Sequence, residues 1–414
     1  MSPITMLPLL LSNPFVVADE TPSPRPLPSF ERIVIDDNFP GGYQIEVADV
    51  NGDKRPDLVA LGGGTCAWYE NPSWQKRIIT GPDQTPGIIS SATTDLDGDG
   101  RAEIAIAYDF AMREPVRGKL GLASQGASPD DDWSFQTITE MPSIHRLRWG
   151  DILGNGRLDL IVAPIFGPAS TPPAFQEDEA RLIVLPSFTI EANRPEPESV
   201  ALAPVMHAIA VVRLPGDDRD SILSADNCGV SLHRRLEVGD PELPRPYQSF
   251  PLTPGASGTP PARGASEVHL GRFGPDHGLL ATIEPWHGST VAISTVRLND
   301  LNPARLQPNR IGPRRILDDT LDEGHALWLA DVNEDGIDEV FAGHRGVDPR
   351  VSVYHFDGKT WNRTILDSTI TAQDLRGGDL NGDDIPDVVA IGGASHSIIW
   401  YRPRPFDSPA NSRP

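Results

Sequence analysis

The sequence predicts an all-β fold, a single seven-bladed β-propeller closed by an N-terminal strand that completes the last blade. Three observations support this prediction. A nine-residue acidic turn recurs seven times at spacings of 46 to 62 residues, which suits one four-stranded blade per repeat. Short apolar strands flank the copies of the turn. The last repeat lacks a fourth strand, and a segment with the fourth-strand pattern precedes the first repeat.

The acidic turn is the most regular element of the repeat. Its clear copies are DVNGDKRPD at 49–57, DLDGDGRAE at 95–103, DILGNGRLD at 151–159, DVNEDGIDE at 331–339 and DLNGDDIPD at 379–387. Two altered copies lie between them, RLPGDDRDS at 213–221 and RFGPDHGLL at 272–280. The fifth position is Asp or Asn in every copy: Asp53, Asp99, Asn155, Asp217, Asp276, Asp335 and Asp383. This recurrence in phase indicates one repeated hairpin.

The segments around each turn predict antiparallel strands. ALWLA precedes the sixth turn and EVFAG follows it, and third strands such as AWYE and VSVYHF come next. Fourth-strand segments are KRIIT, FQTIT, ESVAL, YQSFPL, RRILD and RTILD. Short β-branched and aromatic runs separated by turns indicate sheet, and no helical period is present. ERIVID at 31–36 has the fourth-strand pattern, so its addition to the last blade would remove exposed edges.

The domain boundaries follow from the ends of the repeat array. An apolar run near the N-terminus ends in Val16-Val17-Ala18, an acceptable signal-peptidase site, although no Lys or Arg precedes the run. We therefore expect a signal peptide at 1–18, a linker at 19–29, the propeller at 30–404 and a tail at 405–414, in a secreted or periplasmic protein. No later segment is long and apolar enough to predict a membrane span.

The charge balance limits the expected partners. Asp and Glu number 58 against 35 Lys and Arg, which gives a net charge of −23. Such a surface repels phosphate backbones and anionic lipid, so nucleic acid and membrane surfaces are not expected partners. Divalent cations and neutral sugars are better candidates, and a protein partner stays open. The two cysteines, Cys66 and Cys228, fall in distant blades, so we expect free, buried thiols.

Four of the acidic turns carry enough oxygen ligands for a hard cation such as Ca²⁺. The first two offer Asp49, Asn51, Asp53, Asp57, Asp95, Asp97, Asp99 and Glu103. The last two offer Asp331, Asn333, Asp335, Glu339, Asp379, Asn381, Asp383 and Asp387. We expect structural Ca²⁺ there, and the alternative is that Asp and Asn cap the tight turns through their own backbone. The third copy has lost two ligands, and the fourth and fifth begin with Arg213 and Arg272, whose charge could replace that of the metal.

Three histidines recur in phase with the turns. His145, His207 and His325 each lie six residues before the first position of a turn, whereas ten histidines in 414 residues predict about 0.2 in seven such positions. Tyr43 and Gln373 occupy the same position in the first and last repeats. Because the turn follows the innermost strand, this position begins that strand, roughly 20 Å from the turn and at the opposite mouth of the channel.

The second strand returns the chain to the same mouth. It would bring five further side chains to the histidines: Glu284, Trp286, His287, His344 and Arg345. Converging imidazoles with a carboxylate nearby predict a second divalent-metal site or a set of general acids and bases. A single histidine in such a position is more often a hydrogen-bonded channel lining, but three in phase favour a working site.

The repeats closely resemble the FG-GAP/VCBS propeller family, in which D-x-[DN]-G-D-G-x-x-D turns join the two inner strands. The segments IHRLRWGDILGNGRLDLIVAPIFGP, TIEPWHG and GHALWLADVNEDGIDEVFAGHRG also resemble the propeller part of the aldos-2-ulose dehydratase/isomerase family. That resemblance implies a lyase that eliminates water next to the carbonyl of a keto-sugar such as anhydrofructose. By motif match, the catalytic residues would be His145, His207, Glu284, His287, His325 and Arg345, and the substrate-binding residues Trp286, Tyr43 and His344. The sequence does not separate base from metal ligand.

Two functions fit these observations. The first is an exported propeller with a cation-assisted carbohydrate site, a lyase or dehydratase that acts on keto-sugars. The alternative is a non-catalytic Ca²⁺-binding propeller that recognises a glycan or a protein. The sequence contains no GxSxG nucleophile elbow and neither cysteine has a base in its sequence context, so serine and cysteine hydrolases are not expected.

Overall fold

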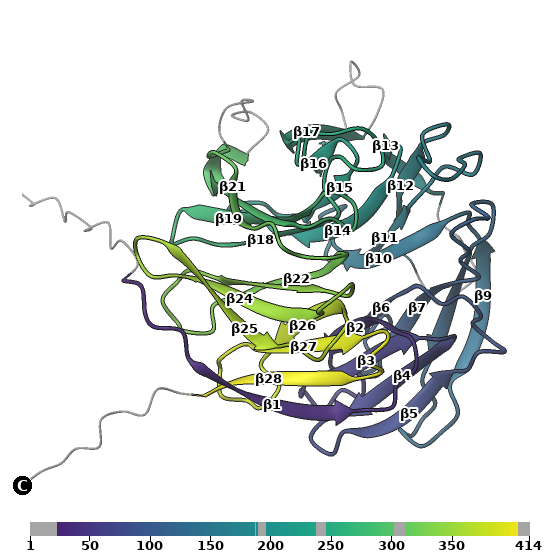
Figure 1. The fold of residues 1–414 in the computed structure, drawn as a ribbon. Coiled ribbons are helices and arrows are strands. Elements are labelled where there is room, and N and C mark those ends of the chain that lie inside the picture. The colour runs from purple at the N-terminus through teal and green to yellow at the C-terminus, as the bar shows by residue number, and fades with distance from the viewer. Residues whose placement is uncertain (1–22, 187, 189–195, 237–245, 302–310, 405–414) are drawn as a thin grey trace, which may run out of the picture.

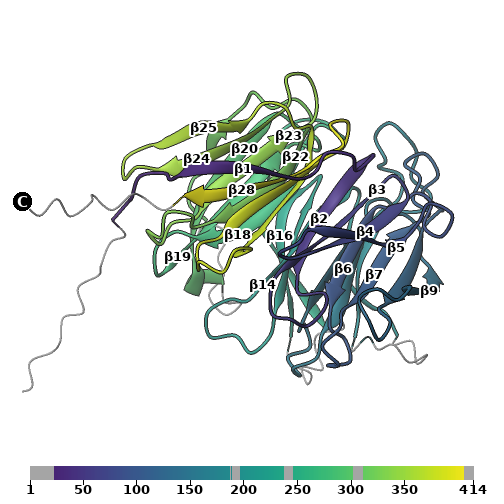
Figure 2. The ribbon, with the colours of Figure 1, turned by 90° about the horizontal axis from the view of Figure 1, so that it is seen from below.

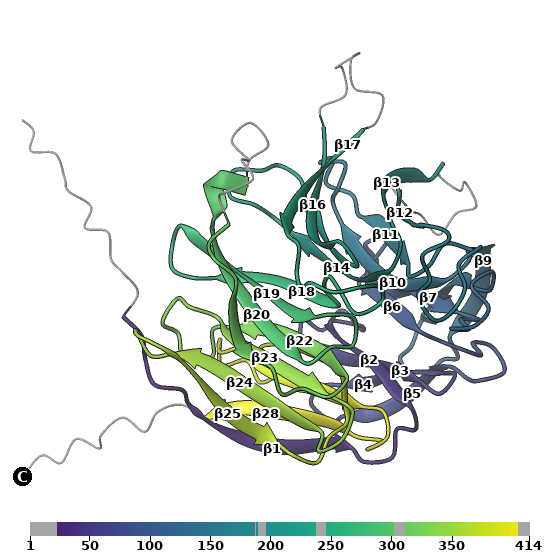
Figure 3. The same ribbon diagram turned by 45° about the horizontal axis from the view of Figure 1, so that its top comes forward.

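Seven four-stranded antiparallel sheets make up the part of the chain that the computed structural model describes, residues 23–186, 188, 196–236, 246–301 and 311–404. Each sheet is one blade, and the blades follow one another around a common axis in sequence order (Figures 1 and 3). The predicted all-β, seven-bladed propeller is confirmed. Within these ranges the only helix is the short 3-10 helix η1 (Leu298–Leu301), and no helix there is long and apolar enough to cross a membrane.

The first and second strands of the blades lie nearest the axis. Each first strand contacts the first strands of the two neighbouring blades, which closes the ring. The first strands are β2 (Gly42–Ala48), β6 (Ser90–Thr94), β10 (Ile144–Gly150), β14 (Met206–Val212), β18 (Glu267–Arg272), β22 (Gly324–Ala330) and β26 (Ala372–Gly378). The second strands are β3 (Asp57–Gly62), β7 (Glu103–Tyr108), β11 (Asp159–Pro164), β15 (Ser221–Asp226), β19 (His277–Glu284), β23 (Glu339–His344) and β27 (Asp387–Gly392).

The third and fourth strands form the outer half of each blade. The third strands are β4 (Thr65–Glu70), β8 (Lys119–Ser124), β12 (Ala180–Leu185), β16 (Gly229–Arg235), β20 (Thr290–Arg297), β24 (Arg350–Phe356) and β28 (Ile398–Arg404). The fourth strands are β5 (Gln75–Thr80), β9 (Ser134–Glu140), β13 (Glu198–Ala203), β17 (Tyr247–Thr253), β21 (Arg315–Asp318), β25 (Trp361–Asp367) and β1 (Ser29–Asp36). Exposed large apolar residues such as Ile78 and Ile365 lie singly on these outer strands.

The two ends of the propeller meet in the seventh blade. Its strand order is β1-β28-β27-β26, with β1 antiparallel to β28 from Ser29 opposite Arg404 to Asp36 opposite Ile398. Purple β1 lies beside yellow β28 in Figure 1 and again in the view from below in Figure 2. The outer strand of the last blade thus comes from the start of the domain. The predicted signal peptide at 1–18 and tail at 405–414 lie outside the described residues.

The core consists of apolar layers between neighbouring blades. The second strands β3, β7, β11, β15, β23 and β27 are buried along their whole length, because a blade covers each face of these sheets. One layer packs Val59 and Trp68 of the first blade against Ile104 and Ile106 of the second. The same arrangement joins the sixth and seventh blades, where Phe341 and Val353 pack with Val388 and Tyr401. Cys66 is buried in the first of these layers, as expected, whereas Cys228 is exposed.

Buried tyrosines link several neighbouring blades at their outer strands. Tyr354 Oη donates to Asp318 of the preceding blade over 2.7 Å, and Tyr401 Oη donates to Asp367 of its preceding blade over 3.0 Å. Tyr69 makes the same contact with Asp36. Each Asp is the last residue of a fourth strand, so these hydrogen bonds fix the distance between successive blades.

Candidate functional site at the axial end of the first strands

A ring of seven residues surrounds the axis where the first strands begin. This rim ring occupies the position six residues before each acidic turn and consists of Tyr43, Ile89, His145, His207, Ser266, His325 and Gln373. In the structure, five of its members are the extra residue of a β-bulge: Tyr43, His145, His207, His325 and Gln373. In the third blade, for example, Ile144 pairs with Pro164 and Arg146 with Ala163, so His145 has no partner. A bulge re-aims a side chain, and here it turns the extra residue toward the axis.

Four imidazoles converge at this ring, and we call them the histidine cluster: His145, His207, His287 and His325. The ring centroid of His207 lies 4.9 Å from that of His145, 4.9 Å from that of His287 and 5.1 Å from that of His325. The centroids of His287 and His325 are 5.1 Å apart. The blades therefore bring together the three histidines that recur in phase, and His287 joins them from the loop after β19.

Three members of the cluster could hold one metal ion. His207, His287 and His325 each offer a ring nitrogen, and these nitrogens lie within 4.8 Å of one another. His145 is not part of this set. Imidazole nitrogens suit Zn²⁺, Fe²⁺, Cu²⁺ and related ions, so the donor set fits a transition metal better than Ca²⁺. These three histidines could therefore serve as ligands of the predicted second metal site.

Backbone carbonyls fix the orientation of the rim histidines. Nδ1 of His145 lies 3.2 Å from the backbone carbonyl oxygen of His207. Nδ1 of His207 lies 2.9 Å from the carbonyl oxygen of Ser266, and Nδ1 of His325 lies 2.6 Å from that of Gln373. Because a carbonyl oxygen only accepts, Nδ1 carries the proton in each neutral ring. The Nε2 lone pairs of these three histidines are therefore free to bind a cation or accept a proton.

His287 has the opposite tautomer. Its Nδ1 lies 3.3 Å from a guanidinium nitrogen of Arg345, which only donates, so the ring proton of neutral His287 is on Nε2. That Nε2 lies 3.1 Å from Nε2 of His207 and donates to it. A cation bound to Nε2 of His287 would replace that hydrogen bond, and the ring proton would then have to move to Nδ1 and displace the Arg345 contact.

Burial keeps the cluster neutral. Removal from water lowers the pKa of all four imidazoles well below the ordinary value, because it penalises the charged form. The positive charge of Arg146 lowers the pKa of His145 and His207 further, and that of Arg345 lowers the pKa of His325 further. Neutral imidazoles are the form that binds metals and accepts protons.

Tyr43 lies between two histidines of the cluster. Its hydroxyl oxygen is 3.0 Å from Nε2 of His145 and 3.4 Å from Nε2 of His325. Arg146 donates to the same oxygen over 3.4 Å. Because both Nε2 atoms accept, the Tyr43 proton has an imidazole acceptor on either side, with His145 the closer one.

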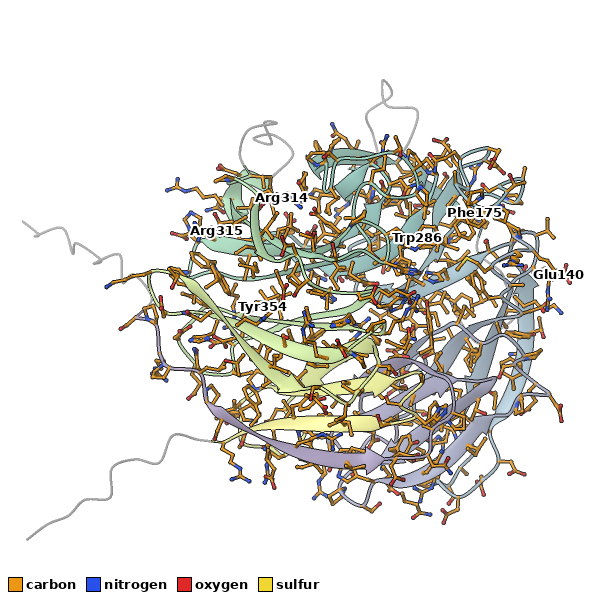
Figure 4. All side chains as sticks on the ribbon, viewed as in Figure 1. Glu140, Phe175, Trp286, Arg314, Arg315 and Tyr354 are labelled. Atoms are coloured by element: carbon orange, nitrogen blue, oxygen red, sulfur yellow. The ribbon has the colours of Figure 1, made fainter. Side chains whose placement is uncertain are left out.

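Arg345 and Trp286 complete the predicted group. Arg345 donates to the Gln373 side chain over 2.7 Å and to Glu323 over 3.0 Å, as well as to His287. The Trp286 ring centroid is 5.1 Å from that of His287 and 6.0 Å from that of Phe175, whose ring stacks on Phe166. Figure 4 labels Trp286 and Phe175 beside each other. These aromatic rings form an apolar wall next to the imidazoles.

Two predicted site residues have their contacts elsewhere. Glu284 accepts hydrogen bonds from Thr282 over 2.7 Å and from Arg314 over 2.8 Å, and in the described part of the chain it makes no hydrogen bond or ion pair with an imidazole. Nδ1 of His344 bonds to the backbone of Asp322, and its Nε2 has no hydrogen-bond partner. Both residues are buried, and each is the last residue of a second strand, one strand away from the first strands that carry the rim ring.

Sequence reasoning missed Arg146 and Glu267. Arg146 touches Tyr43 and His145, and Glu267 lies 3.1 Å from Nδ1 of His207. Each directly follows a rim-ring residue in the sequence. The bulge at His145 allows Arg146 to lie beside the cluster, whereas β18 pairs regularly with β19 from Glu267 onward, so no bulge accounts for the position of Glu267. A charged residue beside a rim position was the available sequence signal.

The acidic turns lie at the other end of the same strands, and their oxygens bind backbone N–H groups. Asp95 accepts from Gly98 and Gly100, and Asp331 accepts from Asp335 and Gly336. The ninth position of each clear copy is buried and accepts the N–H of the second position over 2.9 to 3.1 Å: Asp57, Glu103, Asp159, Glu339 and Asp387. This is the self-capping arrangement of a tight turn, and it leaves further carboxylate oxygens available.

The charges of the turns are unevenly balanced. In the second copy Asp95, Asp97 and Asp99 offer oxygens within 4.8 Å of one another and are exposed. In the sixth copy Arg272, from the altered turn of the preceding blade, lies 3.3 Å from Asp331 and also pairs with Asp338. The arginine of an altered copy thus contacts the turn of its neighbour. Burial, with nearby acidic residues, raises the pKa of Glu103 to about 7 and that of Glu339 to about 9.

Comparison with known proteins supports the repeat assignment. Residues 39–106 match the FG-GAP-like repeat and residues 88–128 match the FG-GAP repeat, so the chain carries FG-GAP repeats. Aldos-2-ulose dehydratase of Phanerodontia chrysosporium is 24% identical over 369 residues, which cover 80% of this chain. The match covers 39% of the length of that protein, so the chain is similar to a part of it.

A solved structure supports the fold. A chain in the crystal structure of the mitotic checkpoint complex superposes on this chain with a TM-score of 0.52, at 9% sequence identity. The superposition covers 97% of this chain and 98% of that one. At this level of identity the likeness concerns the fold alone.

Proposed function

We propose that the protein is a carbon–oxygen lyase that removes water from a keto-sugar at the histidine cluster. The observation that carries this proposal is the convergence of three metal-competent imidazoles beside a Tyr43–His145 pair. The similarity to aldos-2-ulose dehydratase supplies the reaction class and the substrate class. Dehydration next to a carbonyl breaks a C–H bond on the α-carbon and a C–O bond on the β-carbon, forms a C=C bond and releases water.

A divalent transition metal would be held by His207, His287 and His325. When bound, it would supply a Lewis acid that polarises the substrate carbonyl and stabilises the enolate. The protein's part is to present the nitrogens: the Ser266 and Gln373 carbonyls hold His207 and His325 with Nε2 toward the axis. Burial keeps both rings neutral, so no proton competes for those nitrogens near neutral pH.

Tyr43 and His145 would move the protons. Tyr43 donates its proton to Nε2 of His145, and the phenolate oxygen that results is stabilised by Arg146. That oxygen then takes the α-proton of the substrate, and the imidazolium of His145 returns a proton to the departing hydroxyl by way of Tyr43. The residues that would move protons, Tyr43 and His145, are therefore separate from the proposed metal ligands His207, His287 and His325.

Arg345 and Trp286 would orient the sugar. The guanidinium of Arg345 can donate to a hydroxyl or carbonyl oxygen, and the indole of Trp286 can stack on a sugar ring. Gln373 and Glu323 hold the guanidinium, and Phe175 supports the indole. Glu284 has no part in this proposal, because Arg314 neutralises it away from the imidazoles.

We further propose that the four acidic turns at 49–57, 95–103, 331–339 and 379–387 bind structural Ca²⁺ in an exported protein. The carboxylates of Asp95, Asp97 and Asp99 are close enough to share one ion, and their exposure makes them accessible. The self-capping hydrogen bonds hold such a turn in shape with or without the ion. The role of Ca²⁺ would be to offset mutual repulsion at the turn end, away from the chemistry.

The test is a dehydration assay on the purified full chain. Keto-sugars, including aldos-2-uloses, are incubated with protein loaded with Zn²⁺, Mn²⁺ or Co²⁺, and enone formation is followed by ultraviolet absorbance. We expect product formation that disappears in the Tyr43→Phe variant and persists in the Asp99→Asn variant. Sugar binding without any turnover under every metal would contradict the lyase and favour the alternative, a non-catalytic propeller that recognises a glycan.

A further inference from the structure

Glu267 is the one carboxylate that contacts the histidine cluster in the described chain. It begins β18 and follows Ser266 of the rim ring. Its Oε1 lies 3.1 Å from Nδ1 of His207, and the Ser266 carbonyl oxygen lies 2.9 Å from the same nitrogen. Both partners are buried, with 7% of Glu267 and 1% of His207 exposed. Nδ1 of His207 therefore donates to the Ser266 carbonyl oxygen, and the Glu267 carboxylate places a negative charge beside the same nitrogen.

This arrangement sets His207 apart from the other rim histidines. Nδ1 of His145 and Nδ1 of His325 each contact a backbone carbonyl oxygen and no carboxylate. His207 also has the most central position, since its ring approaches those of His145, His287 and His325. The negative charge thus faces the imidazole that all the others surround.

Three arginines act on the buried charge of Glu267: Arg146, Arg148 and Arg376. The nearest is Arg146, whose guanidinium nitrogen lies 3.5 Å away and also reaches Tyr43 and His145. Burial of a carboxylate costs free energy that these arginines offset in part, and a further positive charge close by would offset more of it. A divalent ion on Nε2 of His207 would be that charge, on the far side of the imidazole.

We infer that Glu267 is a positioning residue for the cation site, acting through His207. The negative charge of its carboxylate beside Nδ1 favours the proton on that nitrogen, which the Ser266 carbonyl accepts, and so strengthens Nε2 as a ligand, as carboxylates behind metal-bound histidines do. The inference rests on the proposed function only for the presence of a divalent cation at His207, His287 and His325, and needs no lyase activity.

The experiment measures metal binding by the full chain, with Co²⁺ and Zn²⁺ as probes. Titration calorimetry gives the affinity, and the visible absorption of bound Co²⁺ reports its coordination. The test variant is Glu267→Gln, which keeps the shape and removes the charge. The matched control is Glu46→Gln, since Glu46 also lies on a first strand and bonds to Ser91 and Thr93 without touching an imidazole.

We expect Glu267→Gln to bind Co²⁺ about 10- to 100-fold more weakly than the wild type, with a shifted Co²⁺ spectrum. Glu46→Gln should keep wild-type affinity and spectrum. Equal affinity and an unchanged spectrum in Glu267→Gln would overturn the inference, as would a wild-type chain that binds neither ion at the cluster. Metal binding that depends on Glu267 in a protein without dehydratase activity would overturn the proposed function and leave the inference standing.

Discussion

The two ends of the first strands differ in what repeats. At the turn end, the same acidic side chains recur from blade to blade and hold the same backbone N–H groups. At the axial end, the seven positions of the rim ring carry Tyr, Ile, His, Ser and Gln, and the side chains meet one another. The residues that recur in every repeat therefore form the propeller scaffold, and the residues that differ between repeats at the axial end form the candidate site.

The two ends bury groups of opposite charge type, carboxylates at the turns and imidazoles at the cluster. Burial raises the pKa of the turn carboxylates Glu103 and Glu339 and lowers the pKa of the imidazoles, so both ends favour neutral groups. A cation has different consequences at each end. At the turns it would relieve repulsion between acids, whereas at the cluster it would bind neutral nitrogens. The predictions below separate these two effects.

The largest effect is expected from the loss of a proposed metal ligand. His207→Ala should abolish Co²⁺ binding at the cluster and all dehydratase activity, because the remaining nitrogens provide too few ligands. Calorimetry and the enone assay measure both quantities. Asp97→Asn at the turn end should leave both unchanged. Wild-type Co²⁺ affinity in the His207→Ala variant would contradict the assignment of a cation site to the histidine cluster.

Removal of His145, the proposed acceptor of the Tyr43 proton, should reduce turnover without reducing metal binding. His145→Ala is expected to lower kcat by about 10²- to 10⁴-fold, the usual contribution of a positioned acid or base. One Co²⁺ should still bind per chain, since His145 lies outside the set formed by His207, His287 and His325. Steady-state kinetics and metal analysis of the same sample check this. Loss of the metal together with activity would show that His145 is a ligand.

At the turn end, a single substitution should reduce stability without touching the chemistry. Asp57→Ala removes the acceptor of two buried N–H groups, those of Val50 and Asn71. Each orphaned donor costs about 1–3 kcal/mol of unfolding free energy. Urea denaturation in EDTA measures the loss, with the exposed Asp53→Ala as control, for which we expect a change within about 0.5 kcal/mol. Equal losses in both variants would contradict the capping role of the ninth position.

The smallest effect is a pH dependence that differs between the two ends. The folded pKa of Glu103 is raised to about 7 and that of Glu339 to about 9, so between their ordinary value of 4.5 and these values the folded state holds more protons than the unfolded state. Their contribution to stability is therefore complete at low pH and is lost as the pH rises through 7 to 9. The histidines, with lowered folded pKa values, lose their contribution as the pH falls below the ordinary value of 6.5.

Melting temperatures from pH 5 to 9, with and without Ca²⁺, test this difference. We expect Ca²⁺ to restore stability on the alkaline side and to leave the acid side unchanged. A Ca²⁺ effect that is equal at pH 5 and pH 9 would contradict the account of the turns.

The fold could be predicted from the sequence because local residue patterns specify each element of the repeat. Asp and Gly set the turns, alternating apolar residues set the strands, and the period counts the strands in each blade. The histidine register was visible for the same reason, since His145, His207 and His325 keep one spacing from the turn. That common spacing is sufficient to predict that the three side chains lie at the same end of the propeller.

The details of the site could not be predicted, because bulges and side-chain partners leave no periodic trace. Strict alternation would place Arg146 away from the axis, and the bulge at His145 reverses this. Glu267 lies on a regularly paired strand, and its contact with His207 depends on how neighbouring blades pack. Glu284 and His344 were expected at the cluster because the second strand returns the chain to that end of the propeller. Both reach the correct end of the molecule, but one side chain pairs with Arg314 and the other bonds to the backbone of Asp322.

The most direct test of the central claim is anomalous diffraction from crystals of the full chain soaked in Zn²⁺. The account predicts an anomalous peak about 2.0–2.1 Å from a nitrogen of each of His207, His287 and His325, with His145 outside coordination distance. Zinc bound elsewhere with no density between these three rings, or rings that point into separate pockets, would contradict it.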